Sequence, residues 1–151
     1  MKLKSTHFLN SGQTLVEVVL AIAVAVLVIA GLARIATISI RNAVFARTQA
    51  QATHYTSQAG EWLRAERDSD WTTFAARATS DGSTYCLTNL TWDSGNCTSA
   101  DGTIDNRFVR EATLTLISAS QIQIAVSTTW TDSIGAHAAT VQTVLTSWRD
   151  Q

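Results

Sequence analysis

The feature that most constrains this chain is a run of apolar residues close to its N-terminus. Residues 14–33 contain a single charged side chain, Glu17. At a rise of 1.5 Å per residue, a helix of this length matches the roughly 30 Å hydrocarbon core of a bilayer. A carboxylate inside such a segment costs roughly 2.5 to 3.5 kcal/mol on insertion scales. Glu17 is therefore a candidate functional residue.

The rest of the composition predicts one modest domain beside this segment. The chain has 151 residues, no proline, and 11 basic against 12 acidic residues. This near balance of charge gives no support to a nucleic-acid partner. Lys2 and Lys4 are the only lysines and precede the apolar run. They predict a cytoplasmic N-terminus, although Arg34, Arg41 and Arg47 follow the run, because long domains are translocated largely regardless of charge.

Two ordinary interpretations of the apolar run are a cleaved secretory signal and a permanent single-span anchor. A secretory signal would be cut after the apolar core, where Gly31 and Ala33 offer small residues. Its apolar region is usually only 7 to 15 residues long and has no use for a carboxylate. An anchor explains the length of the run but leaves Glu17 unexplained. Both remain open as routes to a binding domain outside the cytoplasm.

A third interpretation comes from the residues around Glu17. A short basic leader, then Gly12, then an apolar helix with glutamate as the fifth residue after the glycine together resemble the N-terminal signal of type IV prepilins. In that family, prepilin peptidase cleaves after the glycine, and the new N-terminus is usually methylated. The resemblance implies cleavage between Gly12 and Gln13 and methylation of Gln13. Most members carry phenylalanine or another apolar residue at that position.

The resemblance also implies a role for Glu17. Gly12 has no side chain, so its backbone can enter a peptidase cleft closely. Cleavage would expose a cationic amine at Gln13, one helical turn from Glu17, and two charges taken out of water must be paired. In the pilin family this glutamate pairs with the N-terminal amine of a neighbouring subunit, so Glu17 is the expected assembly residue. The alternative is a carboxylate that snorkels to the membrane interface.

The helical pattern continues beyond the apolar run. Apolar residues recur at spacings of three, four or seven: Ile35, Ile38, Phe45, Ala52, Tyr55, Ala59, Trp62 and Leu63. We predict one helix over residues 14–67, with a membrane and assembly half at 13–33 and an amphipathic half at 34–67. Two helices joined near Gly31 or Gly60 are the alternative, because a glycine weakens a helix by up to roughly 1 kcal/mol.

The C-terminal half changes to the alternating pattern of β-strands. Three strands are expected at residues 107–117, 121–130 and 138–148, with a weaker candidate at 84–92. Their short connections predict an antiparallel meander. The expected fold is therefore α+β: after a leader at residues 1–12, a long N-terminal helix packs on a small antiparallel sheet of three or four strands in an exported domain at 68–151. The resemblance to pilins implies the same pilin-like architecture.

Other segments of the chain resemble minor pilins in particular. Residues 59–71 are similar to the helix end of minor pilins and pilin-like proteins, and residues 130–132 and 143–148 to the ends of those sequences. The resemblance implies a structural subunit of a type IV pilus or pilus-like filament. Its partners would be prepilin peptidase, other pilin subunits, the pilus assembly machinery and membrane lipid. Its location would be the bacterial cytoplasmic membrane, then a pilus or pseudopilus on the cell surface.

The remaining chemistry-bearing residues are few. If the C-terminal part is exported, Cys86 and Cys97 are expected to form one disulfide worth roughly 2 to 3 kcal/mol, and otherwise they are free thiols. Two cysteines with no nearby histidine leave a zinc ion short of ligands, so no metal is expected. His7, His54 and His137 are scattered, without a serine or cysteine partner at usable spacing. We therefore expect no cofactor and no enzyme.

Overall fold

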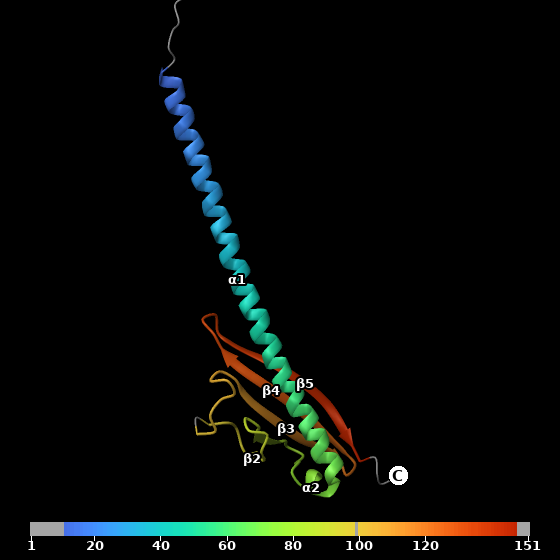
Figure 1. The fold of residues 1–151 in the computed structure, drawn as a ribbon. Coiled ribbons are helices and arrows are strands. Elements are labelled where there is room, and N and C mark those ends of the chain that lie inside the picture. The colour runs from blue at the N-terminus through green and yellow to red at the C-terminus, as the bar shows by residue number, and fades with distance from the viewer. Residues whose placement is uncertain (1–10, 99, 148–151) are drawn as a thin grey trace, which may run out of the picture. The chain divides into compact units, whose positions relative to one another are not determined.

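The computed structural model describes residues 11–98 and 100–147, with side chains from residue 15 onward (Figure 1). The predicted leader at residues 1–12 lies outside the described residues apart from its last two. The elements are α1 (Ser11–Ser69), α2 (Trp71–Ala75), β1 (Ser83–Cys86), β2 (Asp93–Ser94), β3 (Val109–Ser118), β4 (Gln121–Thr131) and β5 (Ala136–Thr146). The chain divides into two compact units, Met1–Phe45 and Ala46–Gln151.

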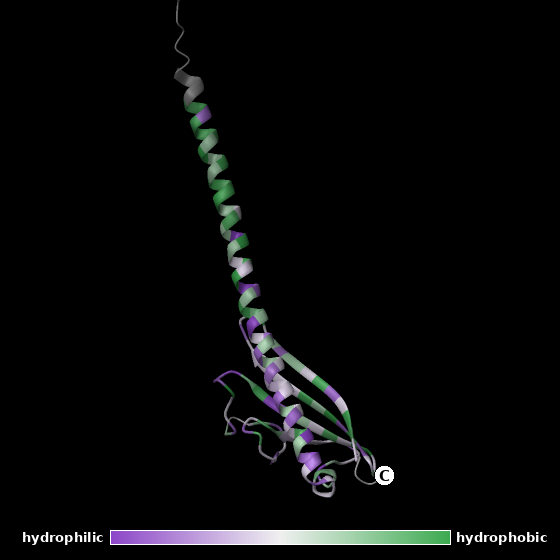
Figure 2. Ribbon diagram, turned by 45° about the vertical axis from the view of Figure 1, so that its right-hand side comes forward, coloured by the Kyte–Doolittle hydropathy of each residue, from purple (hydrophilic) through white to green (hydrophobic). Residues whose placement is uncertain are grey.

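In the first unit, α1 carries exposed apolar side chains. The large apolar residues from Leu15 to Val44 are between 53% and 72% exposed, and Figure 2 shows the predominance of apolar residues along this part of the helix. By length and composition the helix is able to cross a membrane. Gly31 and Gly60 both lie inside α1, which has no break at either of them. The chain therefore forms the single helix that the sequence predicts.

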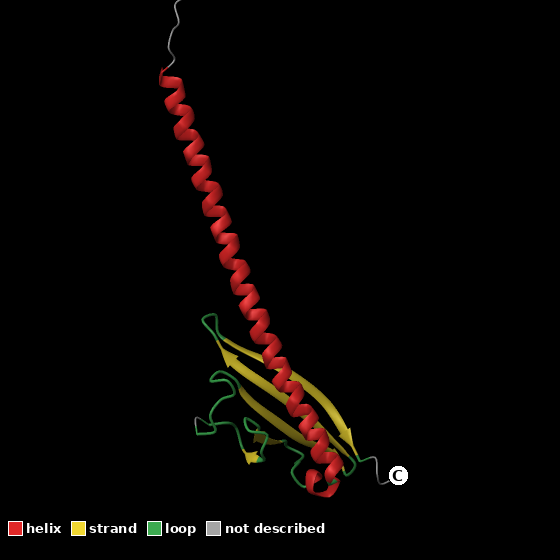
Figure 3. Cartoon of the chain, viewed as in Figure 1, coloured by secondary structure: helices red, strands yellow, loops and turns green. Residues whose placement is uncertain are grey.

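The second unit packs the C-terminal part of α1 on one face of an antiparallel sheet (Figure 3). The strand order is β2-β1-β3-β4-β5. β3, β4 and β5 pair in sequence, and the register places Ile124 between Leu114 and Thr143. The predicted α+β class and the antiparallel meander are confirmed.

The sheet has five strands, where the sequence predicts three or four. The weaker candidate at residues 84–92 is not one strand: β1 ends at Cys86, and the chain returns as β2, which places Cys86 opposite Asp93. Between them Leu90 has a φ of 53°, a left-handed conformation that a non-glycine residue adopts only in a turn. The last strand runs from Ala136 to Thr146, and residue 148 of its predicted range lies outside the described residues.

The buried stripe of α1 begins later than predicted. Ile35 and Ile38 are 65% and 58% exposed, and the first buried residue of the helix is Thr48. Ala52 and Ala59 are fully buried, and small residues at these positions let the helix lie close to the sheet. The core contains two clusters. The larger includes Leu63, Phe74, Leu87, Leu114, Ile122, Ile124 and Val126, and the smaller includes Ala52, Phe108, Trp130 and Ala139.

Candidate functional site

Glu17 is an isolated carboxylate on an exposed apolar helix. Its side chain is exposed, and its neighbours Val16 and Val18 are 70% and 55% exposed. The next charged residue along α1 is Arg34. At 1.5 Å per residue the two positions lie about 25 Å apart along the axis of an α-helix. Arg34 is therefore too far along the helix to neutralise Glu17 within one chain.

The exposed apolar surface of α1 is of the kind that a membrane or another protein covers. Burying one large aliphatic side chain contributes about 1.5 to 3 kcal/mol, and a continuous exposed apolar surface marks a membrane or protein contact. Gly12 and Gln13 lie in the first turn of α1, and the side chain of Gln13 lies outside the described part. Four residues separate Gln13 from Glu17, which is about 6 Å along a helix. A charge at the backbone nitrogen of Gln13 would therefore lie at nearly the same depth as Glu17.

The second unit holds the disulfide that the sequence predicts for an exported domain. Cys86 and Cys97 are bonded, with their Cα atoms 4.8 Å apart and 11 residues of separation. The backbone N–H of Cys97 donates a hydrogen bond of 2.7 Å to the Glu111 carboxylate. The disulfide therefore joins the loop after β2 to β1. The hydrogen bond from Cys97 to Glu111 joins the same loop to β3.

Arg110 is an important structural residue that the sequence analysis did not identify. It is 2% exposed. Its guanidinium donates to the Leu87 carbonyl at 3.0 and 2.8 Å, to the Tyr55 carbonyl at 2.9 Å and to Gln58 Oε1 at 2.9 Å. Burial lowers the pKa of Arg110, but an arginine stays protonated in proteins. Arg110 thus connects α1, β3 and the segment after β1.

The sequence contains a signal for this residue. In β3 the inward positions alternate, and Arg110 occupies the same face as Ala112 and Leu114, both of which are buried. A charged residue in phase with the buried side of a strand must find hydrogen-bond partners there. The identity of those partners depends on where α1 packs, which the spacing along β3 does not reveal.

A second polar contact also fixes α1 on the sheet. Thr56 Oγ1 lies 2.9 Å from Thr128 Oγ1 on β4 and 3.1 Å from the Ala139 carbonyl oxygen on β5. Thr56 and Thr128 are 1% and 0% exposed. Because these buried hydroxyl groups are hydrogen-bonded to each other, they fix the position of the helix across two strands.

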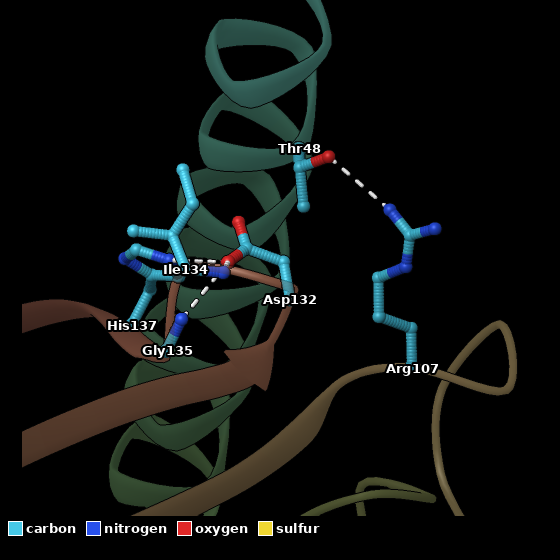
Figure 4. Close-up of polar contacts among 6 residues, drawn as sticks. All are labelled: Thr48, Arg107, Asp132, Ile134, Gly135 and His137. Carbon is cyan, nitrogen blue, oxygen red and sulfur yellow. Dashed lines mark hydrogen bonds and ion pairs between the residues drawn. The ribbon is translucent and has the colours of Figure 1, made fainter. Parts of the chain in front are cut away.

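The turn between β4 and β5 is held by Asp132 (Figure 4). Asp132 Oδ1 accepts hydrogen bonds from the backbone N–H groups of Ile134 at 2.7 Å and Gly135 at 3.2 Å. The same atom lies 3.1 Å from His137 Nε2. The hydrogen bond from Ile134 and the contact with His137 lower the pKa of Asp132. The carboxylate form of Asp132 thus stabilises the turn.

Asp132 therefore makes the stability of the second unit sensitive to acid. Because its pKa in the folded state is depressed, its contribution is complete above the unfolded pKa of about 3.9 and is lost as the pH falls below that value. We expect Asp132→Ala to lower the thermal unfolding midpoint at pH 7 and the difference from wild type to shrink towards pH 2. Circular dichroism of the full chain in detergent micelles measures this. A difference that stays constant from pH 7 to pH 2 would contradict it.

Among residues 11–98 and 100–147, no group of three or more histidine, cysteine, aspartate or glutamate side chains could hold a metal ion. The features with functional potential are therefore the exposed apolar helix with Glu17 and the disulfide-bonded domain. Comparison with protein-family models, with curated proteins and with solved structures finds no match to this chain.

Proposed function

We propose that this chain is a structural subunit of a type IV pilus or pilus-like filament, of the minor pilin kind. Prepilin peptidase cleaves it after Gly12, and it assembles through α1. The observation that carries this proposal is Glu17, the single charged residue of the exposed apolar run at residues 14–33 and the fifth residue after Gly12. The protein acts by self-assembly and carries out no catalysis.

The exposed surface of α1 gives the proposal its physical basis. Lipid covers the apolar residues before assembly, and the helices of other subunits cover them afterwards. Within that apolar surrounding, the Glu17 carboxylate pairs with the amine at Gln13 of a neighbouring subunit, because unpaired charges there cost several kcal/mol. The pairing gives each new subunit a defined position along its neighbour.

The second unit also supports the proposal. A long helix on a small antiparallel sheet is the arrangement expected of pilins. The Cys86–Cys97 disulfide forms and persists in oxidising compartments, which favours a location of this unit outside the cytoplasm. We therefore place the subunit in the bacterial cytoplasmic membrane, with its N-terminus in the cytoplasm, and later in a filament at the cell surface.

Mass spectrometry of the N-terminus tests the proposal. We expect protein from the native membrane to begin at Gln13, with or without one methyl group. Replacing Gly12 with leucine should leave the chain uncleaved, because a side chain there hinders close approach of the scissile backbone. Gly31→Ala is the matched control, since no atom lies within 4 Å of a Cβ added at Gly31, and its N-terminus should match that of the wild type.

Other results would point to a different function. An intact Met1 in the wild type would indicate a single-span anchor, and a start near Arg34 would indicate an ordinary secretory signal. In either case the chain would be better described as a binding domain outside the cytoplasm. Either result would overturn the filament proposal, because the amine that pairs with Glu17 would not exist.

A further inference from the structure

The charges of this chain are divided between two regions. Residues 18–60 contain Arg34, Arg41 and Arg47 and no acidic residue. Residues 61–151 contain eleven of the twelve acidic residues against six arginines. Residues 18–60 are thus basic and residues 61–151 acidic. Two copies of the chain have complementary charges wherever the basic region of one meets the acidic region of the other.

Within the first unit, two of these arginines form a stripe. Arg34 and Arg41 are seven residues apart, so they lie on the same side of an α-helix and about 10 Å apart along it. Both are exposed, and neither guanidinium has a hydrogen bond or ion pair to another described residue. The small side chains of Ala33 and Thr37 leave a shallow hollow that these arginines border together with Ile38.

Within the second unit, two carboxylates have the same spacing. Glu61 and Asp68 are also seven residues apart on α1, and their side chains are 70% and 45% exposed. Leu63 is fully buried, which places the sheet on another side of the helix from Glu61. Glu61 contacts Arg64, and Asp68 contacts Arg67 at 2.7 Å. The Glu61–Arg64 pair is exposed on both sides, and exposed ion pairs contribute little to stability, so it exchanges easily for another partner. In the second pair Arg67 is 18% exposed, and Asp68 keeps 45% of its side chain exposed for a further contact.

We propose that the stripe of Arg34 and Arg41 binds the carboxylates of Glu61 and Asp68 on a second copy of this chain. The equal spacing of the two pairs lets Arg34 face Glu61 and Arg41 face Asp68 on a parallel neighbour. This inference rests on the proposed function, because it requires copies that assemble side by side with the same polarity. It adds a second electrostatic contact, outside the apolar segment that contains Glu17. Arg34 and Glu61 are 27 residues or about 40 Å apart along a helix, whereas Gln13 and Glu17 are about 6 Å apart, so the second contact is made with a different neighbour.

Phosphates of membrane lipids fit the stripe less well. Arg34 directly follows the apolar run and can reach the headgroup layer, which adds roughly 5 to 8 Å to each side of the hydrocarbon core. Arg41 lies about 10 Å further along the helix, beyond that layer. Lipid phosphates therefore lie close to Arg34 and further from Arg41, whereas a second copy offers a carboxylate to each.

Charge reversal in two differently tagged copies tests the contact. The first variant carries Arg34→Glu and Arg41→Glu, and the second carries Glu61→Arg and Asp68→Arg. We expect each variant to co-purify with its own kind from native membranes about tenfold less than wild type, because both attractions become repulsions. When the two variants are expressed together, every contact between them is attractive again, and co-purification should return to near the wild-type level.

The matched control is Arg47→Glu. Arg47 is also exposed, but it lies six residues after Arg41 and so on a different side of a helix. It should leave co-purification unchanged. Co-purification of either double variant alone at the wild-type level would overturn the inference. So would a mixed pair that does not return to the wild-type level, or an equal loss of co-purification with Arg47→Glu. An intact disulfide and wild-type circular dichroism show that the variants fold.

The proposed function fails in a different way. If the chain does not assemble, wild-type copies do not co-purify at all, and the N-terminus does not begin at Gln13. If only the stripe is assigned wrongly, wild-type copies co-purify and begin at Gln13, and the reversed variants behave in the same way.

A cross-link from a photoreactive residue at Thr37 provides a direct check. It should join the peptide that contains Glu61 on the other copy, and a link to lipid would favour the membrane instead.

Discussion

Replacing Arg110 with leucine is expected to lower the free energy of unfolding of the second unit by about 2 to 4 kcal/mol. The guanidinium is buried and donates to Leu87, Tyr55 and Gln58. Leucine fills part of the volume but donates to none of them, and each buried acceptor that loses its donor costs about 1 to 3 kcal/mol. Urea unfolding of the full chain in detergent micelles, followed by tryptophan fluorescence, measures the change.

Arg107→Leu is the matched control for this prediction. Arg107 is three residues away and exposed, and its guanidinium donates a hydrogen bond of 3.2 Å to Thr48. Its replacement should change stability by less than about 1 kcal/mol. Arg110→Lys should fall between wild type and Arg110→Leu, because an ammonium keeps the charge but lacks the planar fork of donors. Equal stabilities of the two leucine variants would contradict the importance of Arg110.

The hydrogen bonds of Arg110 are contacts that the sequence alone does not predict. The long helix, the three main strands and the disulfide follow from patterns within short stretches of the chain, namely the apolar run, the period of two and the presence of two cysteines. Arg110 reaches from β3 to Tyr55, 55 residues away along the chain. A contact of that kind depends on how the helix packs on the sheet. Periodicity alone predicts that Arg110 points inward but not which groups it meets.

Local backbone geometry explains the one error in the sheet. The segment 84–92 has the composition of a strand, but the left-handed conformation of Leu90 turns the chain back after β1. The short pairing of Tyr85 with Ser94 then adds β2 at the edge. Leucine gives no sequence signal for such a turn, because glycine and asparagine are the residues that ordinarily occupy it.

The surroundings of Glu17 are also not predictable from one copy of the chain, whereas the fold largely is. The environment of Glu17 is not contained in one copy of the chain, since its side chain and its apolar neighbours are exposed. The sequence points to Glu17 because its charge contradicts the rest of the run. The partner must come from lipid, from solvent or from another subunit. An experiment on assembly is therefore the appropriate test of this residue.

Glu17→Gln is expected to reduce incorporation into filaments by at least tenfold while insertion and cleavage continue. Glutamine keeps the shape of the side chain but removes the charge, which makes the segment cheaper to insert into a bilayer. In the filament, however, the amine at Gln13 of the neighbouring subunit loses its counter-charge. Leaving one partner of a buried ion pair unpaired costs about 3 to 5 kcal/mol, which amounts to a factor of a hundred or more in an equilibrium. Cooperative packing of the apolar residues offsets part of this loss.

The measurement is the amount of the variant in sheared filaments relative to its amount in the membrane, with the N-terminus checked by mass spectrometry. Asp81→Asn is a suitable control, because it makes the equivalent change at an exposed carboxylate, which accepts a 3.4 Å hydrogen bond from Ser80. It should enter filaments like the wild type. Wild-type incorporation of Glu17→Gln would show that the carboxylate has no partner in the assembly. A loss of cleavage would instead assign Glu17 to recognition by the peptidase. If cleavage is retained and incorporation is lost, the role of Glu17 lies in the contact between subunits.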